Sequence, residues 1–273
     1  DHAANPHHAR RWAILALLGI AQLMVVLDGT VVNIALPSAQ ADLGFSDADR
    51  QWIITAYTLA FGSLLLFGGR LADVMGRKSV LLIGLIGFSI ASAVGGSAPS
   101  FEVLVIARGA QGLFGALLAP AALSTLTTTF TDPDERGKAF GIYGAIAGAG
   151  AAIGLILGGF LTEYLSWRWC LYVNLVLAVP AAVAAFALLV NQRPEGKARL
   201  DLLGTVVVSV GLLGIVYGCS KAESDGWTAP ITLGLLIGGL VLVALFVLIE
   251  TRVANPLLPM RVVLDRGRAG AYM

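Results

Sequence analysis

Eight long apolar runs, separated by short charged segments, constrain this chain more than any other feature of its sequence. A helix that crosses a bilayer needs about 20 predominantly apolar residues. The runs are Trp12–Leu36, Trp52–Phe67, Ser79–Ser97, Val103–Thr127, Ala139–Thr162, Cys170–Val190, Leu202–Cys219 and Ile231–Ile249. We therefore predict an all-α integral membrane protein with eight transmembrane helices.

The composition excludes most classes of soluble protein. Hydrophobic residues make up 57% and charged residues 13% of the 273 residues, whereas a soluble domain carries about 25% charged residues. All three His residues lie in the first eight positions, and Cys170 and Cys219 lie inside apolar runs. The sequence therefore predicts no enzyme active site, no metal site and no cofactor, and no basic patch indicates a nucleic-acid partner.

The charged segments predict the orientation of the chain. If the N-terminus is cytoplasmic, most of the 18 Lys and Arg residues fall in cytoplasmic segments, and Arg50, Arg168 and Lys221 fall in outer ones. Such a bias is the positive-inside pattern of membrane proteins. Four Trp residues then lie at the outer interface: Trp52, Trp167, Trp169 and Trp227. We expect a multi-pass protein of the cell (inner) membrane.

A short pattern occurs at the ends of the second and fifth apolar runs. Residues 68–73 read Gly-Gly-Arg-Leu-Ala-Asp, and residues 158–163 read Gly-Gly-Phe-Leu-Thr-Glu. The first copy is predicted on the cytoplasmic side and the second outside, which is what two inverted three-helix repeats would produce. The alternative is chance similarity between two helix ends.

Two charged residues, Asp28 and Arg108, lie inside apolar runs. A charge at the centre of a bilayer costs about 2.5–3.5 kcal/mol on insertion scales, so such residues are usually functional. At about 1.5 Å per residue, the two lie about 12 Å and about 10 Å below the predicted outer ends. They could therefore share a water-filled cavity, where a carboxylate beside an arginine can bind and release a proton. The alternatives are a static pair that fastens helices, or an Asp28 that stays solvated near the interface.

The segment between the second and third runs concentrates charge around two glycines. We expect a cytoplasmic gate formed by Gly69, Asp73, Gly76, Arg77 and Lys78, because these charges can hold one conformation closed and release it in another. The plainer interpretation is that they are positive-inside charges on a short loop, and both interpretations can hold together.

Small and polar residues inside the runs complete the set of candidates. Gly150, Gly154 and Gly158 recur every four residues and, with Gly159, predict close packing of the fifth helix. Polar side chains inside runs either line a cavity or bond across helices. The candidates for a substrate cavity are Asn33, Gln111, Gln22 and Tyr57.

These motifs resemble the major facilitator superfamily, in particular its fourteen-helix drug:proton antiporters of the EmrB/QacA type. The segment 69–78 resembles the superfamily signature between helices two and three, and residues 27–37 resemble the first-helix signature of the antiporters. Residues 108–112 resemble the fourth-helix signature, whose Arg is tied to proton coupling, and residues 150–159 resemble the fifth-helix antiporter signature. Smaller matches lie at Trp167–Trp169, Asn174 and Asn255–Pro259.

Three positions depart from the family pattern. Val74 stands where the loop signature usually has Arg or Lys, and Leu155 stands where the antiporter signature has Pro. Val176 stands where a Pro commonly follows Asn174. The first change weakens the expectation of a charge relay in the gate. The second weakens the expectation of a kink in the fifth helix, because Leu restores the backbone donor that Pro lacks.

The resemblance implies a major-facilitator-type six-helix bundle of two inverted three-helix repeats plus two further transmembrane helices. The implied organisation is a cytoplasmic tail (1–11), the transport bundle (12–190), a cytoplasmic loop with two extra linker helices (191–250), and a cytoplasmic segment (251–273) that leads to a missing C-terminal half. The chain is thus expected to be the N-terminal portion of a longer transporter.

The resemblance also implies a function, which is export of lipophilic or cationic drugs by H+ antiport and alternating access, driven by the proton gradient. Asp28 would exchange the proton and Arg108 would tune it. The expected partners are a small lipophilic or cationic substrate, protons, membrane lipid and the missing six-helix half. One alternative is a facilitator that exports or imports an endogenous metabolite, lipid or antibiotic. Another is a non-transporting membrane scaffold.

Overall fold

The computed structural model describes residues 8–190 and 202–250, and within them the chain forms eight α-helices and one short 3-10 turn, His8–Arg10. The helices are α1 (Arg11–Leu43), α2 (Asp47–Met75), α3 (Arg77–Gly96), α4 (Phe101–Thr129), α5 (Pro133–Tyr164), α6 (Trp169–Leu188), α7 (Leu202–Asp225) and α8 (Pro230–Glu250). Each predicted apolar run overlaps one of them, with ends that differ by one or two residues at α3 and α6, and all eight helices are long and apolar enough to cross a membrane. The predicted all-α membrane fold is confirmed. The predicted tail up to residue 7, the loop at 191–201 and the segment 251–273 lie outside the described residues.

Several helices extend beyond the apolar runs because polar residues cap them. Helix α2 begins at Asp47, where the Ser46 hydroxyl accepts a hydrogen bond from the Asp49 backbone N–H (3.2 Å) and the Asp49 carboxylate accepts in return. Helix α5 begins at Pro133, where the Asp132 carboxylate accepts from the backbone N–H groups of Asp134 and Glu135, both at 3.0 Å. The helices therefore start in polar sequence and only then enter the apolar runs.

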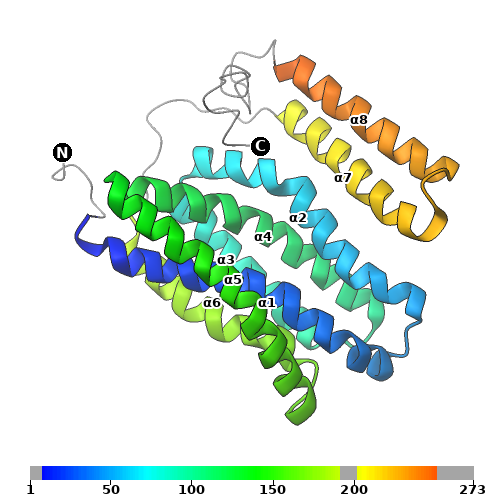
Figure 1. Cartoon of the computed structure of the whole chain (residues 1–273), viewed down its shortest axis with the longest axis horizontal. Helices are drawn as coiled ribbons and strands as arrows, with labels where there is room; N and C mark the ends of the chain where they lie inside the picture. Colours follow the sequence, from blue (N-terminus) through cyan, green and yellow to red (C-terminus); the bar gives the residue numbers. More distant parts are fainter. Residues whose placement is uncertain (1–7, 191–201, 251–273) are drawn as a thin grey trace.

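Helices α1 to α6 form a bundle whose contacts repeat (Figure 1). Helix α1 packs on α5 and α6, α4 packs on α2 and α3, and α3 packs on α6. If α1–α3 are exchanged with α4–α6 in order, the α1·α5 contact becomes the α4·α2 contact, and α1·α6 becomes α4·α3. The packing therefore has the internal symmetry of two inverted three-helix repeats.

Two basic side chains obey the same symmetry at the opposite ends of the bundle. Lys78, at the start of α3, donates from Nζ to the Phe186 carbonyl near the end of α6 (2.7 Å). Arg168, at the start of α6, donates from a guanidinium N–H to the Gly96 carbonyl at the end of α3 (3.0 Å). The second donor, Arg168, lies ninety residues after Lys78. The second acceptor, Gly96, lies ninety residues before Phe186. Each cation stabilises the C-terminal end of the partner helix, where the helix dipole is negative.

The glycine pairs of the repeat make equivalent helix contacts. A Cβ on Gly68 would collide with the Ala116 carbonyl of α4, and a Cβ on Gly158 would lie 3.2 Å from the Val31 Cα of α1. The second glycine of each pair is less confined, since a Cβ on Gly69 would be 3.6 Å from Pro120 and one on Gly159 would meet nothing within 4 Å. The first glycine of each pair therefore allows the close helix contact.

Helices α7 and α8 form a hairpin that packs beside α2 (Figure 1). Small residues join the two helices, since a Cβ on Gly211 would lie 3.1 Å from the Gly239 carbonyl oxygen. The hairpin contacts the bundle through α2, where the Thr55 and Ser220 hydroxyls lie 3.4 Å apart. One face of α2 is thus covered by α4 and another by α7.

Candidate functional site

Four helices converge on the carboxylate of Asp28. Its Oδ2 accepts a hydrogen bond from the Arg108 guanidinium of α4 at 2.5 Å. Its Oδ1 accepts from the Gln111 amide of α4 at 2.9 Å and from the Asn174 amide of α6 at 2.8 Å. Ser92 of α3 accepts from the same two amides, at 2.7 Å and 3.3 Å. These five residues, Asp28, Ser92, Arg108, Gln111 and Asn174, are called here the Asp28 cluster.

The Asp28 cluster is enclosed by protein. Asp28, Gln111, Ser92 and Asn174 are 0% exposed, and Arg108 is 2% exposed. This burial contradicts the alternative in which Asp28 stays solvated near the interface. The two charged side chains are also in direct contact with each other. A buried carboxylate and arginine require such pairing, since an isolated charge there would be costly.

The hydrogen-bond partners of the Asp28 carboxylate are all donors, so both of its oxygens act as acceptors. Asn174 keeps a spare acceptor, because its buried Oδ1 has no hydrogen-bond partner within the described part of the chain.

Arg108 is positioned from α2 as well. Its Nε donates to the Ile53 carbonyl at 3.4 Å, and its Cζ lies 4.4 Å from the centre of the Tyr57 ring. A guanidinium over an aromatic face is attracted by the ring quadrupole. Tyr57 was expected to line the substrate cavity, and its ring packs against the Arg108 guanidinium. The same ring is stacked on Phe61, with ring centres 5.8 Å apart.

Two of the predicted cavity residues lie away from the Asp28 cluster. Gln22 accepts a hydrogen bond from the Tyr143 hydroxyl at 2.7 Å, so it bonds across α1 and α5. Asn33 is exposed and donates to the Gly29 carbonyl of its own helix at 2.8 Å. Gln111, by contrast, belongs to the cluster. Of the four predicted cavity residues, Gln111 and Tyr57 therefore contact Arg108, whereas Gln22 and Asn33 make their hydrogen bonds elsewhere on α1.

The predicted cytoplasmic gate is anchored to the bundle at three points. Gly76 has φ 89°, a backbone conformation that favours glycine, and it ends α2 and precedes α3. Arg77 donates to the Ser124 hydroxyl of α4 at 2.5 Å, and Lys78 reaches α6. Asp73 lies 3.7 Å from Arg70 one helical turn away. Gly69 packs near Pro120 of α4.

The fifth-helix glycines contact α1. A Cβ on Gly150 would lie 3.1 Å from Leu23, and one on Gly154 would collide with the Thr30 hydroxyl. Gly158 faces Val31, as described above, whereas Gly159 lies off this contact because it is one residue further around the helix. Leu155 and Val176 are exposed on α5 and α6. Helix α5 runs without interruption through Leu155.

A charged cluster at the predicted outer end of the bundle was missed by sequence reasoning. Asp42 of α1 accepts from the Trp167 indole N–H at 3.0 Å and pairs with Arg168 at 3.1 Å. Trp167 is therefore buried at 5% exposure, whereas the other three Trp residues predicted at the outer interface, Trp52, Trp169 and Trp227, are exposed. The Trp-Arg-Trp motif was the available signal, but its partner Asp42 lies far away in sequence.

Residues 18–255 match the sequence profile of the Major Facilitator Superfamily. The chain belongs to this family. The fold of α1 to α6 and the packing described above thus have a common origin with those of other members.

Relatives named for resistance to a compound or for its export match almost the whole chain. It is 56% identical to the puromycin resistance protein of Streptomyces alboniger, over 97% of this chain and 52% of that one. It is 44% identical to the cephamycin export protein of Amycolatopsis lactamdurans, over 90% and 51%. It is 37% identical to the tetracenomycin C resistance and export protein of Streptomyces glaucescens, over 94% and 48%. The chain spans about half the length of these relatives.

A solved structure has the same fold. It is a bacterial homologue of the human lysosomal transporter Spinster, in an inward-facing and unoccupied conformation. The TM-score is 0.54 at 21% sequence identity, and the match covers 88% of this chain and 61% of that one. This likeness supports the fold described above.

Proposed function

We propose that this chain forms part of a proton-coupled exporter of lipophilic or cationic drugs, in which Asp28 carries the exchanged proton. The observation that carries the proposal is the Asp28 cluster, a fully buried carboxylate held by three N–H donors from two other helices. The relatives named for antibiotic resistance and export support export of a drug, and the lipophilic or cationic class follows from the motif resemblance.

Protonation of Asp28 would change how α1, α4 and α6 are held together. Charge-assisted hydrogen bonds are about twice as strong as neutral ones, so neutralising Asp28 weakens its bonds to Arg108 and Asn174 together. A half-turn of the Asn174 amide would then present its unpartnered Oδ1 to the new O–H group. One proton thereby changes the contacts of three helices.

The rest of the transport cycle follows the fourteen-helix antiporters that the motifs resemble. Alternating access moves one half of the transporter against the other, so it requires a second six-helix half in addition to α1–α6. The segment Gly69–Lys78 would gate the cytoplasmic side, since Arg77 and Lys78 tie α3 to α4 and α6. Asn33, exposed on α1, would contact substrate from the open face of the bundle.

A dedicated exporter of one antibiotic is the second candidate. The relatives are named for single compounds, namely puromycin, cephamycin and tetracenomycin C. The Asp28 cluster would serve this function equally well. A screen with chemically unrelated lipophilic cations distinguishes the two, because the dedicated exporter would confer resistance to one chemical class.

Efflux measured with and without a proton gradient tests the proposal. Cells carrying the full-length protein, or its Asp28→Asn variant, are matched for membrane abundance and loaded with ethidium. Asp134→Asn, an exposed carboxylate at the start of α5, is the matched control. We expect the wild type and control to lose efflux when the gradient is collapsed, and Asp28→Asn to show only the residual rate throughout. Gradient-dependent efflux retained by Asp28→Asn would contradict the assignment of the proton to Asp28.

A further inference from the structure

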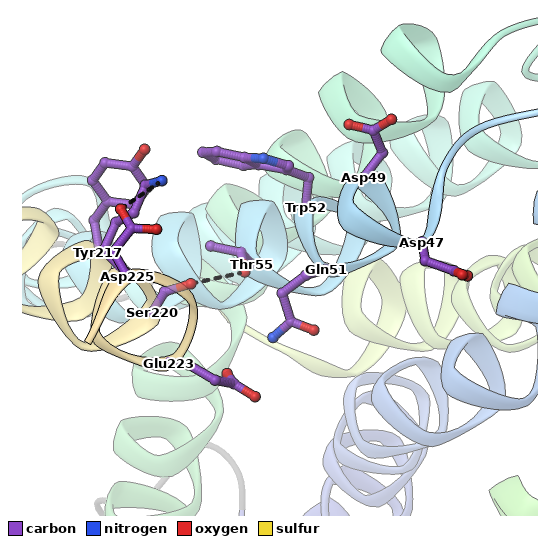
Figure 2. A pocket seen from close by; sticks show the side chains of 10 residues that line it. Asp47, Asp49, Gln51, Trp52, Thr55, Tyr217, Ser220, Glu223 and Asp225 are labelled. Atoms are coloured by element: carbon purple, nitrogen blue, oxygen red, sulfur yellow. Dashed lines mark hydrogen bonds and ion pairs between the residues drawn. The ribbon is translucent and has the colours of Figure 1, made fainter. Parts of the chain in front are cut away.

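A cavity of about 440 Å³ lies between the start of α2 and the end of α7, apart from the Asp28 cluster. Its lining includes Asp47, Asp49 and Trp52 from α2, and Tyr217, Glu223 and Asp225 from α7 (Figure 2). This end of both helices is the one predicted to face outside the cell. The volume falls in the range of about 300–1,000 Å³ that is typical of small-molecule sites.

Two aromatic rings form one side of the cavity. The rings of Trp52 and Tyr217 have centres 5.6 Å apart and are inclined by 40° (Figure 2). The hydroxyls of Thr55 and Ser220, each three residues after one of the two ring residues, lie 3.4 Å apart between the same two helices. Both pairs join α2 to α7 beside the cavity. Exposed aromatic faces attract cations, and quaternary ammonium groups above all.

The charged residues at the rim are predominantly acidic. Asp49 caps α2, Asp47 lies 3.2 Å from Arg50, and Asp225 lies 3.3 Å from Lys221. Glu223 makes no hydrogen bond or ion pair with any other described residue. Lys221 is the one basic residue of the lining, which leaves the cavity with net negative charge.

Helix capping accounts for the acidic residues of α2 but not for those of α7. Carboxylates in a first turn stabilise a helix, whereas Glu223 and Asp225 lie in the last turn of α7, where the helix dipole is already negative. Their placement adds negative potential to that of the helix end. Within the described ranges, no three His, Cys, Asp or Glu residues come close enough together to hold a metal ion. The negative charge is spread around the cavity, as suits a larger cation.

We infer that this cavity binds an organic cation that carries an aromatic or bulky apolar group. Trp52 and Tyr217 contact the apolar body of the ligand and attract its charge, and Glu223 supplies a negative charge that no other described residue pairs. The inference rests on the proposed export function for the class of ligand. It adds to that function a second, outer site at which the α7–α8 hairpin takes part in handling the substrate.

Protection of a thiol placed in the cavity tests the inference. The full-length protein in nanodiscs carries Cys219→Ser, which removes an exposed thiol, and Gln51→Cys at an exposed position of the lining. The rate of alkylation by N-ethylmaleimide is measured against the concentration of tetraphenylphosphonium, with uncharged triphenylphosphine oxide as the comparison. We expect the cation to slow alkylation and the oxide to leave it unchanged.

Two further variants connect the protection to named side chains. Glu223→Gln and Trp52→Leu are each expected to raise the half-protecting concentration about ten-fold, the weakening typical of losing one such contact. Glu163→Gln, the same change at an exposed position of α5, is expected to leave it unaltered. Absence of protection by the cation, equal protection by the oxide, or equal behaviour of Glu223→Gln and Glu163→Gln would overturn the inference.

The same assay separates this site from the proposed proton coupling. Asp28→Asn is expected to abolish gradient-driven efflux while leaving the protection of the thiol intact. Loss of protection in a protein that still exports ethidium would refute the outer site alone. Intact protection in a protein with Asp28 unchanged, whose efflux does not depend on the proton gradient, would refute only the proton-coupled function.

Discussion

The carboxylate of Asp28 and the guanidinium of Arg108 are buried together, so each is the main compensation for the charge of the other. Removing one partner of a buried pair is more damaging than removing both, because the remaining charge is left uncompensated in a medium of low dielectric constant. The Asp28 cluster is therefore as much a structural centre of the bundle as a candidate proton site.

This asymmetry predicts the stability of single and double variants. Arg108→Met should destabilise the protein by about 3–5 kcal/mol, and Asp28→Leu combined with Arg108→Met should recover part of that loss. Thermal unfolding in detergent, followed by tryptophan fluorescence, measures both. If Arg108→Met unfolds at the wild-type temperature, or if the second substitution adds to the damage, the pair is not mutually compensating.

Asn174 and Asn33 provide a matched pair of amides. Asn174→Leu removes a hydrogen bond to a buried charge and should cost about 1.5–3 kcal/mol. Asn33→Leu removes an exposed bond within one helix and should change the unfolding temperature much less. The comparison uses the same thermal assay. Equal shifts for both variants would show that Asn174 does not stabilise Asp28.

Residue counting placed Asp28 and Arg108 at similar depths, but it could not identify their other partners. Ser92 and Asn174 were not singled out as members of this site. The reason is physical: α3 and α6 are apolar on most of their surface, so no polar stripe fixes their rotation. Gln22 illustrates the converse, since its polarity serves a bond to Tyr143.

At the scale of helices, close approach depends on one glycine of each repeated pair. Gly68 lies against the backbone of α4, and Gly158 lies against the backbone of α1. The sequence pattern identified the two glycine pairs. It could not show which glycine of each pair contacts the neighbouring helix. Only the direction in which α2 and α5 face their neighbours distinguishes them.

We therefore expect alanine substitutions at the two neighbouring glycines of α2 to have opposite effects on stability. Gly68→Ala should destabilise the protein by about 1–3 kcal/mol, the usual cost of overpacking, because its Cβ would collide with the Ala116 carbonyl. Gly69→Ala should be neutral or slightly stabilising, because alanine favours a helix over glycine by up to about 1 kcal/mol. Unfolding temperatures and membrane abundance report the difference. A reversed order would mean that α2 is rotated relative to the structure described.

Helix ends were predicted less well than helix centres. The apolar run Trp52–Phe67 covers only the middle of α2, which extends from Asp47 to Met75. Hydropathy detects the part of a helix that suits lipid, whereas Ser46 and Gly76 determine where the helix begins and ends.

At the scale of the whole molecule, the positive-inside bias predicts which ends of the bundle face the cytoplasm. In a Cys219→Ser background, a cysteine at Glu163 should react with a membrane-impermeant maleimide added to intact cells. A cysteine at Asp134 should react only after the membrane is opened. Both positions are exposed at helix ends, so reactivity reports sidedness. Labelling of Asp134→Cys alone in intact cells would reverse the proposed orientation.

The position of the α7–α8 hairpin beside α2 was not predictable from sequence. Its helices are largely apolar along their membrane-spanning lengths, and such surfaces pack equally well against lipid or protein. The contacts that place it, Thr55 with Ser220 and Trp52 with Tyr217, join residues that are more than a hundred positions apart. The acidic cavity between them follows from this placement and from no local motif.

The central claim is that Asp28 gains and loses a proton in the working protein, and infrared difference spectroscopy tests it without any substrate. The full-length protein is compared at alkaline and acidic pH, with Glu163→Gln as the control for exposed carboxylates. We predict that acidification produces a C=O stretching band of a protonated buried carboxyl group, and that Asp28→Asn lacks this band while Glu163→Gln retains it. An identical band in Asp28→Asn would show that Asp28 stays ionised beside Arg108, as a static pair that holds the helices together.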